Sequence, residues 1–198
     1  MICVIDCATT GLIDWRANPQ APHQPHIVRV AMTYVDPSTY AIVPEETMVW
    51  IVAPPVDIDK AGTDMHGIDE RNLSMSVNCP SIDALLQAFG ERLEAAEVVT
   101  GYSVDFHRRV LERAAAFIGG EISWPAQKVC IMRAAAPVVQ VGKGKNGAWM
   151  WPRFDDAVPI LLGHEAPQPT GRPYEDGKDR VETVGAMYAA LMKRGEVK

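Results

Sequence analysis

The chain has 198 residues, which suits a single domain, and 47% of them are hydrophobic, enough to form one sizeable core. Its formal net charge is −6, whereas a protein that holds nucleic acid by general neutralisation of phosphates is normally basic. This balance excludes a broadly basic nucleic-acid surface. Either nucleic acid is not the ligand, or it is held by local contacts and by carboxylate-bound metal ions such as Mg²⁺.

The four cysteines form no C-x-x-C pair and no metal-ligand spacing with the five histidines. Cys3 and Cys7 lie in or just after an apolar strand and are interpreted as small core residues. At this length and density of cysteine, a disulfide framework is not expected. No apolar run approaches the roughly 18 residues of a membrane-spanning helix, and the N-terminus lacks the basic region of a secretory signal. We therefore expect a cytoplasmic protein.

The first predicted elements are strands. Residues 1–6 form a short apolar run, rich in β-branched side chains and closed by an acid, which is typical of a central buried strand. A polar, proline-rich loop covers residues 13–25. Residues 26–36 alternate in polarity and predict a second strand, and residues 40–52 predict one or two more after a proline turn. These strands are expected to form an antiparallel meander.

Helical spacing dominates the rest of the chain. Apolar residues recur on one face of residues 81–96, with Ser81 as the predicted N-cap. The other predicted elements are a short helix over 57–65, a strand over 98–101, helices over 106–118, 154–162 and 179–193, a strand-to-helix segment over 129–136, and loops over 141–148 and 164–177. No repeat or linker divides the chain. The order therefore predicts a single α/β domain over residues 1–198, with a mixed sheet flanked by helices.

One segment, Asp6-Cys7-Ala8-Thr9-Thr10-Gly11-Leu12, carries the most informative functional pattern. It resembles motif I of the DEDD superfamily of 3′–5′ exonucleases, D-x-E-T-T-G-L, in the branch of proofreading subunits. This resemblance implies a ribonuclease-H-like fold. In the family, carboxylates two residues apart on one side of the sheet hold two Mg²⁺ or Mn²⁺ ions, which activate water and stabilise the leaving oxygen.

The chain keeps the first acid of this motif as Asp6 but has Ala8 at the second position. The resemblance implies that Asp6 is a metal ligand, that the turn at residues 9–11 approaches the terminal nucleotide, and that Leu12 lies beside the terminal base. The competing interpretation is a buried strand that ends in a turn, with Asp6 as a cap. Ala8 is either natural divergence or a replaced glutamate.

Further matches follow in the same order along the chain. The segment His66-Gly67-Ile68 resembles the helix-end signature of the family, which implies that His66 and Ile68 line the pocket for the 3′ nucleotide. Considered alone, His66 is also interpreted as a structural histidine held by hydrogen bonds.

The segment from Val99 to Leu111 resembles motif II, in which a strand ends in G-H-N and a helix starts at F-D. Alignment on Phe106, which the resemblance adds to the nucleotide pocket, puts His107 where the family has a catalytic aspartate. Imidazole binds divalent metals, but it suits Zn²⁺ or Mn²⁺ better than Mg²⁺. Asp105 lies two residues earlier and is interpreted as the helix N-cap.

The segment Tyr174-Glu175-Asp176-Gly177-Lys178-Asp179 resembles motif III at the start of the final helix. Asp179 matches the metal-binding aspartate, and Tyr174 takes the place of the histidine that acts as general base or positions water. A tyrosine with its ordinary pKa of about 10 is a poor base at neutral pH. Alternatively, Asp176 and Asp179 are ordinary acids at a helix N-terminus, favoured by the helix dipole.

The resemblance predicts a metal-dependent 3′–5′ exonuclease that acts on single-stranded DNA or RNA ends. The activity is expected to be impaired because Ala8, His107 and Tyr174 depart from the catalytic set. The implied partners are a nucleic-acid 3′ end and a polymerase or other replication protein. Two alternatives stay open: a non-catalytic pseudo-exonuclease that binds 3′ ends or nucleotides, and a protein-interaction module that reuses the fold.

A glycine-rich segment combines Lys143, Lys145 and Asn146 with Trp149 and Trp151. One interpretation is that the lysines contact phosphate while the tryptophans stack on bases. The other is a solvated loop whose tryptophans pack against the protein.

Overall fold

The computed structural model describes residues 1–69, 73, 80–163 and 177–197. The strands in these ranges are β1 (Ile2–Thr9), β2 (Ile27–Val35), β3 (Ile42–Ile51), β4 (Val98–Gly101) and β5 (Gln127–Cys130). They form one mixed sheet in the order β3-β2-β1-β4-β5. β1, β2 and β3 are antiparallel neighbours, whereas β1, β4 and β5 run parallel. The apolar first strand is thus central, as predicted.

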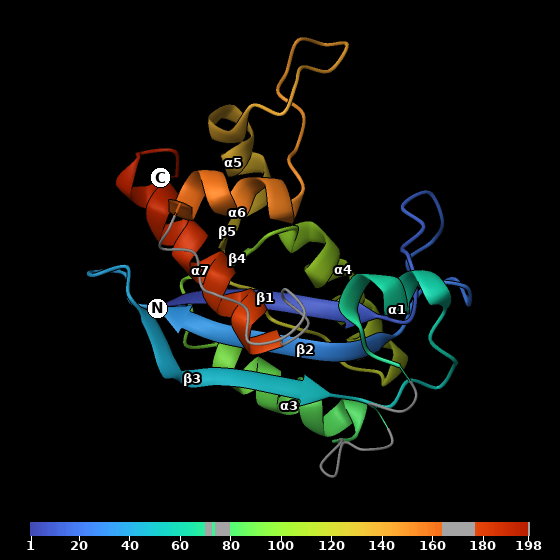
Figure 1. Cartoon of the computed structure of the whole chain (residues 1–198). Helices are drawn as coiled ribbons and strands as arrows, with labels where there is room; N and C mark the ends of the chain where they lie inside the picture. Colours follow the sequence, from blue (N-terminus) through green and yellow to red (C-terminus); the bar gives the residue numbers. More distant parts are fainter. Residues whose placement is uncertain (70–72, 74–79, 164–176, 198) are drawn as a thin grey trace.

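The described helices are α1 (Lys60–His66), α3 (Ile82–Leu93), α4 (Val104–Phe117), α5 (Ile131–Val139), α6 (Phe154–Leu162) and α7 (Gly177–Lys193). α7 and α3 lie on opposite sides of the sheet (Figure 1). α5, α6 and α7 share a core with Ile2 and Val4 of β1, while α3 and α4 pack around Cys3 and Ile5. Successive side chains of a strand point to opposite faces, so β1 contributes to two cores. The predicted α/β architecture is confirmed.

Local sequence signals placed the ends of the described elements to within three residues. Ser81 caps α3 as predicted, because its side chain accepts a hydrogen bond from the backbone amide of Ala84 at 3.2 Å. β4 and α6 have the predicted bounds. The strand pattern over residues 40–52 forms the single strand β3, whose pairing with β2 is irregular between Met32 and Tyr34.

Asp105 does not cap α4, contrary to the prediction. The cap position is Ser103, and Asp105 lies in the first turn of the helix. Its carboxylate pairs with Lys128 at 2.6 Å and with Arg133 at 2.9 Å. The interpretation is wrong because α4 begins at Val104, two residues before the expected start.

The two predicted loops have different outcomes. Residues 141–151 contain a short antiparallel pairing between Lys143 and Trp149, so this segment is a hairpin. Residues 164–176 lie outside the described ranges, and α7 begins directly after them, at Gly177. Among the described helices, none combines the length and apolarity needed to cross a membrane.

The start of α7 is packed tightly onto β2. A Cβ atom on Gly177 would lie 2.8 Å from Nε of Arg29, so only glycine leaves room for that side chain at this position. Further along α7, Val181 and Val184 are fully buried in the core that includes Val4 and Ala31. This packing holds the first turn of α7 above the centre of the sheet.

Candidate functional site at the carboxyl end of β1

The site is centred on Asp6, which lies near the end of β1 and is only 5% exposed. The strand register pairs Asp6 with Ala31 and Ala8 with Arg29 of β2. Side chains two residues apart on a strand point to the same face, and directly paired residues share a face. Asp6, Ala8 and Arg29 therefore lie together on the face that α7 covers.

Three side chains from three elements surround the carboxylate of Asp6. Arg29 Nη2 lies 3.4 Å from Oδ2, Arg180 Nε lies 3.5 Å from Oδ1, and His107 Nε2 lies 3.8 Å from Oδ1. Burial alone would raise the pKa of Asp6. Attraction to the guanidinium groups of Arg180 and Arg29 outweighs burial and lowers this pKa below its ordinary value. The carboxylate is therefore ionised, and its charge is balanced by side chains of the protein itself.

His107 is held in a neutral form. Its Nδ1 accepts a hydrogen bond of 3.0 Å from the backbone amide of Cys7, so the ring proton is on Nε2, which faces Asp6. Burial lowers the pKa of His107 to about 4, and this outweighs the opposing attraction of Asp6. A metal ligand needs the lone pair of a ring nitrogen. In His107 that lone pair is already used by Cys7.

Within the part of the chain that the structure describes, the donor set around Asp6 does not fit the metal centre that the resemblance implies. Ala8 supplies no oxygen and is itself buried against Val28 and Ile68. Across residues 1–69, 73, 80–163 and 177–197, no group of three or more His, Cys, Asp or Glu side chains is arranged to hold a metal ion. The Asp6 carboxylate already pairs with two guanidinium groups, which repel a divalent cation.

The expected metal ligand of the last helix, Asp179, lies in the first turn of α7. The ion pair that α7 makes with Asp6 comes from Arg180, the next residue. Successive helical residues are turned by about 100° around the axis, so a shift of one position decides which side chain faces the site. Tyr174, the expected general base, lies outside the described residues.

The turn over residues 9–12 is fixed by contacts with its surroundings. The amide and the hydroxyl of Thr10 both bond to the backbone of His26, at 2.9 and 3.0 Å. The carbonyl of Thr10 accepts a hydrogen bond from the amide of Asp59 at 2.8 Å. A Cβ atom on Gly11 would collide with the Asp59 carboxylate, so the loop before α1 can approach only because residue 11 is glycine.

His66 fastens α1 to the same turn. Its Nδ1 accepts from the amide of Ile68 at 3.1 Å, so Nε2 carries the proton and donates to the carbonyl of Thr9 at 2.9 Å. Burial lowers the pKa of His66, which keeps the ring neutral. These are the hydrogen bonds of a structural histidine, and they hold the turn beside Asp6.

The other expected nucleotide contacts lie at the edges of this arrangement. Leu12 is 65% exposed, whereas Ile68 is buried beside Ala8. Phe106 is half-buried, with its ring edge-on to His107 at 5.2 Å. The structure thus gathers Asp6 and the 9–12 turn with His66, Ile68, Phe106 and His107.

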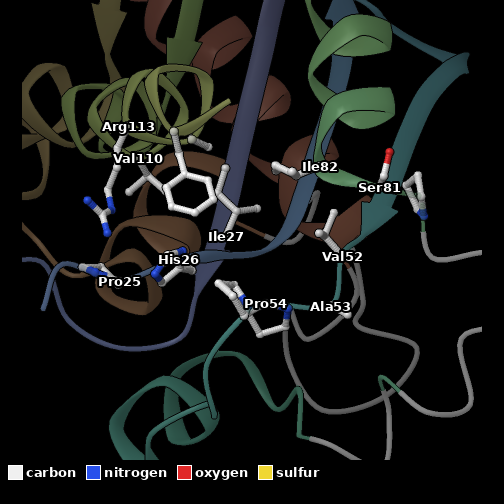
Figure 2. A pocket seen from close by; sticks show the side chains of 14 residues that line it. Pro25, His26, Ile27, Val52, Ala53, Pro54, Ser81, Ile82, Val110 and Arg113 are labelled. Atoms are coloured by element: carbon white, nitrogen blue, oxygen red, sulfur yellow. The ribbon is translucent and has the colours of Figure 1, made fainter. Parts of the chain in front are cut away.

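A separate apolar cavity of about 490 Å³ lies on the other face of the sheet (Figure 2). Ile27, Val52, Ile82 and Val110 contribute to its lining, and these residues belong to the core beneath α3 and α4. None of the site residues predicted from the sequence lines this cavity. It is therefore distinct from the site around Asp6.

The sequence reasoning missed Arg29 and Arg180. Arg29 is a single charge within an otherwise uncharged, fully buried strand, and such a charge requires a partner. That signal indicates an ion pair but does not identify Asp6. Arg180 gives no signal of its own because its neighbour, Asp179, fits the expected motif.

Comparisons with known proteins agree with this architecture. No family model and no curated protein matches the sequence. Among solved structures, exonuclease X in complex with 5′ overhanging duplex DNA has a TM-score of 0.61 at 18% identity, over 100% of this chain and 95% of that chain. E. coli exonuclease I in complex with a dT13 oligonucleotide has a TM-score of 0.69 at 14% identity, over 97% of this chain but only 40% of that chain.

A third similar structure is a 3′-exonuclease described for 3′-end specific recognition of a histone mRNA stem-loop. It has a TM-score of 0.64 at 14% identity, over 98% of this chain and 82% of that chain. At such low identities the likeness concerns the fold. The chain therefore has the α/β, ribonuclease-H-like fold of these exonucleases.

Proposed function

We propose that the protein binds the 3′ end of single-stranded nucleic acid without hydrolysing it. The observation that carries this proposal is the pairing of Asp6 with Arg29 and Arg180, at 3.4 and 3.5 Å. Fixed guanidinium groups occupy the surroundings of the carboxylate that would otherwise attract metal ions. Two-metal hydrolysis depends on those ions to generate the nucleophile and to stabilise the leaving oxygen, so binding without turnover is the expected outcome.

Binding is supported by the geometry that remains. The 9–12 turn is held in place by α1 and by the start of β2, and the exposed side chain of Leu12 lies at its edge. Arg180 is 25% exposed and offers a positive charge beside the turn-bearing strand. Guanidinium groups bind phosphate with well-defined geometry. Two of the similar structures are complexes with 5′ overhanging duplex DNA and with a dT13 oligonucleotide, and the third is described for 3′-end specific recognition of a histone mRNA stem-loop.

The test combines a binding assay with a turnover assay. A single-stranded oligonucleotide of about 12 nucleotides, labelled at its 5′ end, is titrated with the protein in EDTA, in Mg²⁺ and in Mn²⁺. The expected result is salt-sensitive binding of similar strength in all three conditions, with no shortened product on a denaturing gel. Metal-dependent shortening that disappears in Asp6→Asn would show a hydrolase. Absence of binding at low salt would leave only a protein-interaction module.

Two substitutions sharpen this test. Arg180→Gln is expected to weaken binding about tenfold, as for loss of one charged hydrogen bond. Arg194→Gln, just beyond the other end of α7, is the matched control and is expected to bind like the unchanged protein. Ala8→Glu restores the carboxylate of motif I and is nevertheless expected to release no product, because both arginines still pair with Asp6.

Other expectations from the sequence stay predictions. These are a single exonuclease-like domain over residues 1–198, a cytoplasmic location and a polymerase or replication partner. The roles of Asp179 as a metal ligand and of Tyr174 as a base belong to the hydrolytic alternative. Repeating the binding assay with a DNA oligonucleotide and with an RNA oligonucleotide of the same sequence shows which of the two the protein prefers.

A further inference from the structure

The hairpin over residues 141–151, here called the 141–151 arm, projects beyond α5 and α6 (Figure 1). Its two sides are joined by a hydrogen bond from the amide of Gly144 to the carbonyl of Ala148 at 2.9 Å. A second bond runs from the amide of Met150 to the carbonyl of Gly142 at 2.8 Å. The arm is therefore an ordered, extended element on the surface.

The arm carries charge of the opposite sign to the rest of the chain. Residues 141–153 contain Lys143, Lys145 and Arg153 and no acidic residue, whereas the whole chain has a net charge of −6. Large apolar side chains are exposed beside these cations, with Trp151 at 57% and Met150 at 48%. Local positive charge with exposed aromatic rings is the composition of surfaces that bind single-stranded nucleic acid.

Cations and indole rings alternate on one side of the arm. Lys143 Nζ lies 4.8 Å from the centre of the Trp149 ring, and Arg133 Cζ of α5 lies 5.2 Å from the centre of the Trp151 ring. Trp149 and Trp151 are two residues apart in extended chain and so face the same way. Such a row presents flat rings for bases and charges for phosphates at the same time.

The base of the arm is joined to the candidate site. The hydroxyl of Tyr102 donates to the carbonyl of Pro152 at 2.8 Å, and the Tyr102 ring packs edge-on against Phe154 at 5.1 Å. Phe154 in turn lies 3.6 Å beneath the guanidinium of Arg180, whose Nε contacts Asp6. A nucleic-acid strand whose 3′ end lies at the site around Asp6 therefore has the arm as its neighbour on the side of Arg180 and Phe154.

We infer that the 141–151 arm is a second contact surface for single-stranded nucleic acid, and that it binds nucleotides upstream of the 3′ end. Lys143 and Lys145 contact phosphates, and the rings of Trp149 and Trp151 stack on bases. The assignment of upstream nucleotides rests on the proposed function, which puts the 3′ end near Asp6. Contact between the arm and a strand does not depend on it.

The arm is tested with paired variants. Trp151→Ala removes an aromatic ring, whereas Trp151→Phe keeps one. The double variant Lys143→Gln with Lys145→Gln removes two positive charges, whereas Lys143→Arg with Lys145→Arg keeps them. The double variant Lys193→Gln with Arg194→Gln, at the end of α7, removes the same two positive charges elsewhere and controls for net charge. Affinities are measured by fluorescence anisotropy for a dinucleotide, for a linear strand of about 12 nucleotides and for a circular strand of the same sequence.

The expected result is a loss of affinity for the long linear strand of about tenfold in Trp151→Ala and in the glutamine double variant. Affinity for the dinucleotide should not change, and the phenylalanine and arginine variants should bind normally. The salt slope of the glutamine double variant should be shallower by about 1.4, which corresponds to two phosphate contacts on a single strand.

The outcomes separate this inference from the proposed function. If the arm variants bind the linear strand like the unchanged protein, and the unchanged protein prefers linear to circular strands, the inference is overturned and 3′-end binding stands. If the variants lose affinity for linear and circular strands alike, and the unchanged protein does not distinguish them, the arm is supported and 3′-end binding fails. A protein that binds neither strand contradicts both.

Discussion

Arg180 reaches Asp6 across the interior of the molecule, with Nε 3.5 Å from Oδ1 of the carboxylate. This contact joins the last helix to the first strand, and Arg29 adds a second guanidinium from β2. A catalytic carboxylate that binds metal ions commonly lowers the stability of the metal-free protein, and its substitution then raises that stability. Asp6 is in the opposite situation, because it pairs with two positive charges.

Asp6→Asn should therefore destabilise the protein. The substitution keeps the shape of the side chain but removes the carboxylate that pairs with two largely buried guanidinium groups, and the loss of one partner of a buried ion pair typically costs about 3 kcal/mol. Urea denaturation measures the free energy of unfolding. Asp64→Asn, which removes an exposed partner of Lys60, is the control and should change little. An Asp6→Asn protein as stable as the unchanged protein would contradict the ion-pair assignment.

The protein should also become less stable as the pH decreases through the window set by His107. The ring has a pKa of about 4 in the folded protein and an ordinary pKa of 6.5. Below pH 6.5, His107 is protonated in the unfolded chain but stays neutral in the folded protein. The free energy of unfolding therefore decreases as the pH falls, until the folded protein also binds the proton near pH 4. The difference between these two pKa values corresponds to a loss of about 3 kcal/mol in the free energy of unfolding. Asp6 itself titrates below this window, because its pKa is lowered.

His107→Asn isolates this contribution. Its side-chain oxygen can still accept the amide hydrogen of Cys7, but it does not titrate. Urea denaturation of both proteins at several pH values should give curves that converge as the pH falls from neutral toward 4. Other buried histidines, such as His66, affect both proteins equally. Parallel curves would mean that His107 is not held neutral by burial.

Two helical glycines should respond in opposite directions to alanine. A Cβ atom on Gly62 of α1 would lie 2.9 Å from the carbonyl oxygens of Thr9 and Thr10, so Gly62→Ala should push α1 off the turn and cost about 1–3 kcal/mol. Gly90 in α3 has no atom within 4 Å of that position, and Gly90→Ala should stabilise by about 0.5–1 kcal/mol. Thermal denaturation of the pair checks both. Equal effects would mean that α1 does not rest on the turn.

Removal of the Tyr102 hydroxyl should loosen the base of the 141–151 arm. Tyr102→Phe leaves the buried carbonyl of Pro152 without its donor, which typically costs about 1–3 kcal/mol. Hydrogen exchange of the arm amides should accelerate while that of β1 stays slow. Tyr40→Phe, at a half-buried tyrosine elsewhere, is the control. Unchanged exchange in the arm would show that this hydrogen bond does not anchor it.

Much of the fold was predictable because its signals are local. The apolar run before Asp6 specifies a buried strand, Ser81 marks a helix start, and the apolar spacing of α3 specifies one buried face. The helix containing Asp105 shows the limit of such signals. It starts two residues before the expected position, and Asp105 lies in its first turn, where it pairs with Lys128 and Arg133 instead of capping the helix.

The proximity of several candidate residues was predictable, but the charges that surround Asp6 were not. Asp6, the 9–12 turn and His107 do come together, as the motif order implies. What surrounds Asp6 depends on long-range register: Arg29 comes from the neighbouring strand, and Arg180 is set by the rotation of α7. A shift of one residue along α7 decides whether Asp179 or Arg180 faces Asp6. No local pattern in the sequence carries this information.

The cluster of Arg29, Asp6 and Arg180 also couples three segments that are far apart in the sequence, because the charges come from β2, β1 and α7. A single substitution toward an acid at residue 180 removes one of the positive partners of Asp6 and adds a like charge next to it. A change at Ala8 alone leaves both arginines in place. An acidic side chain at residue 180 is therefore expected to lower the stability of the protein. The sign of the charge at the start of the last helix is thus constrained by a residue in the first strand.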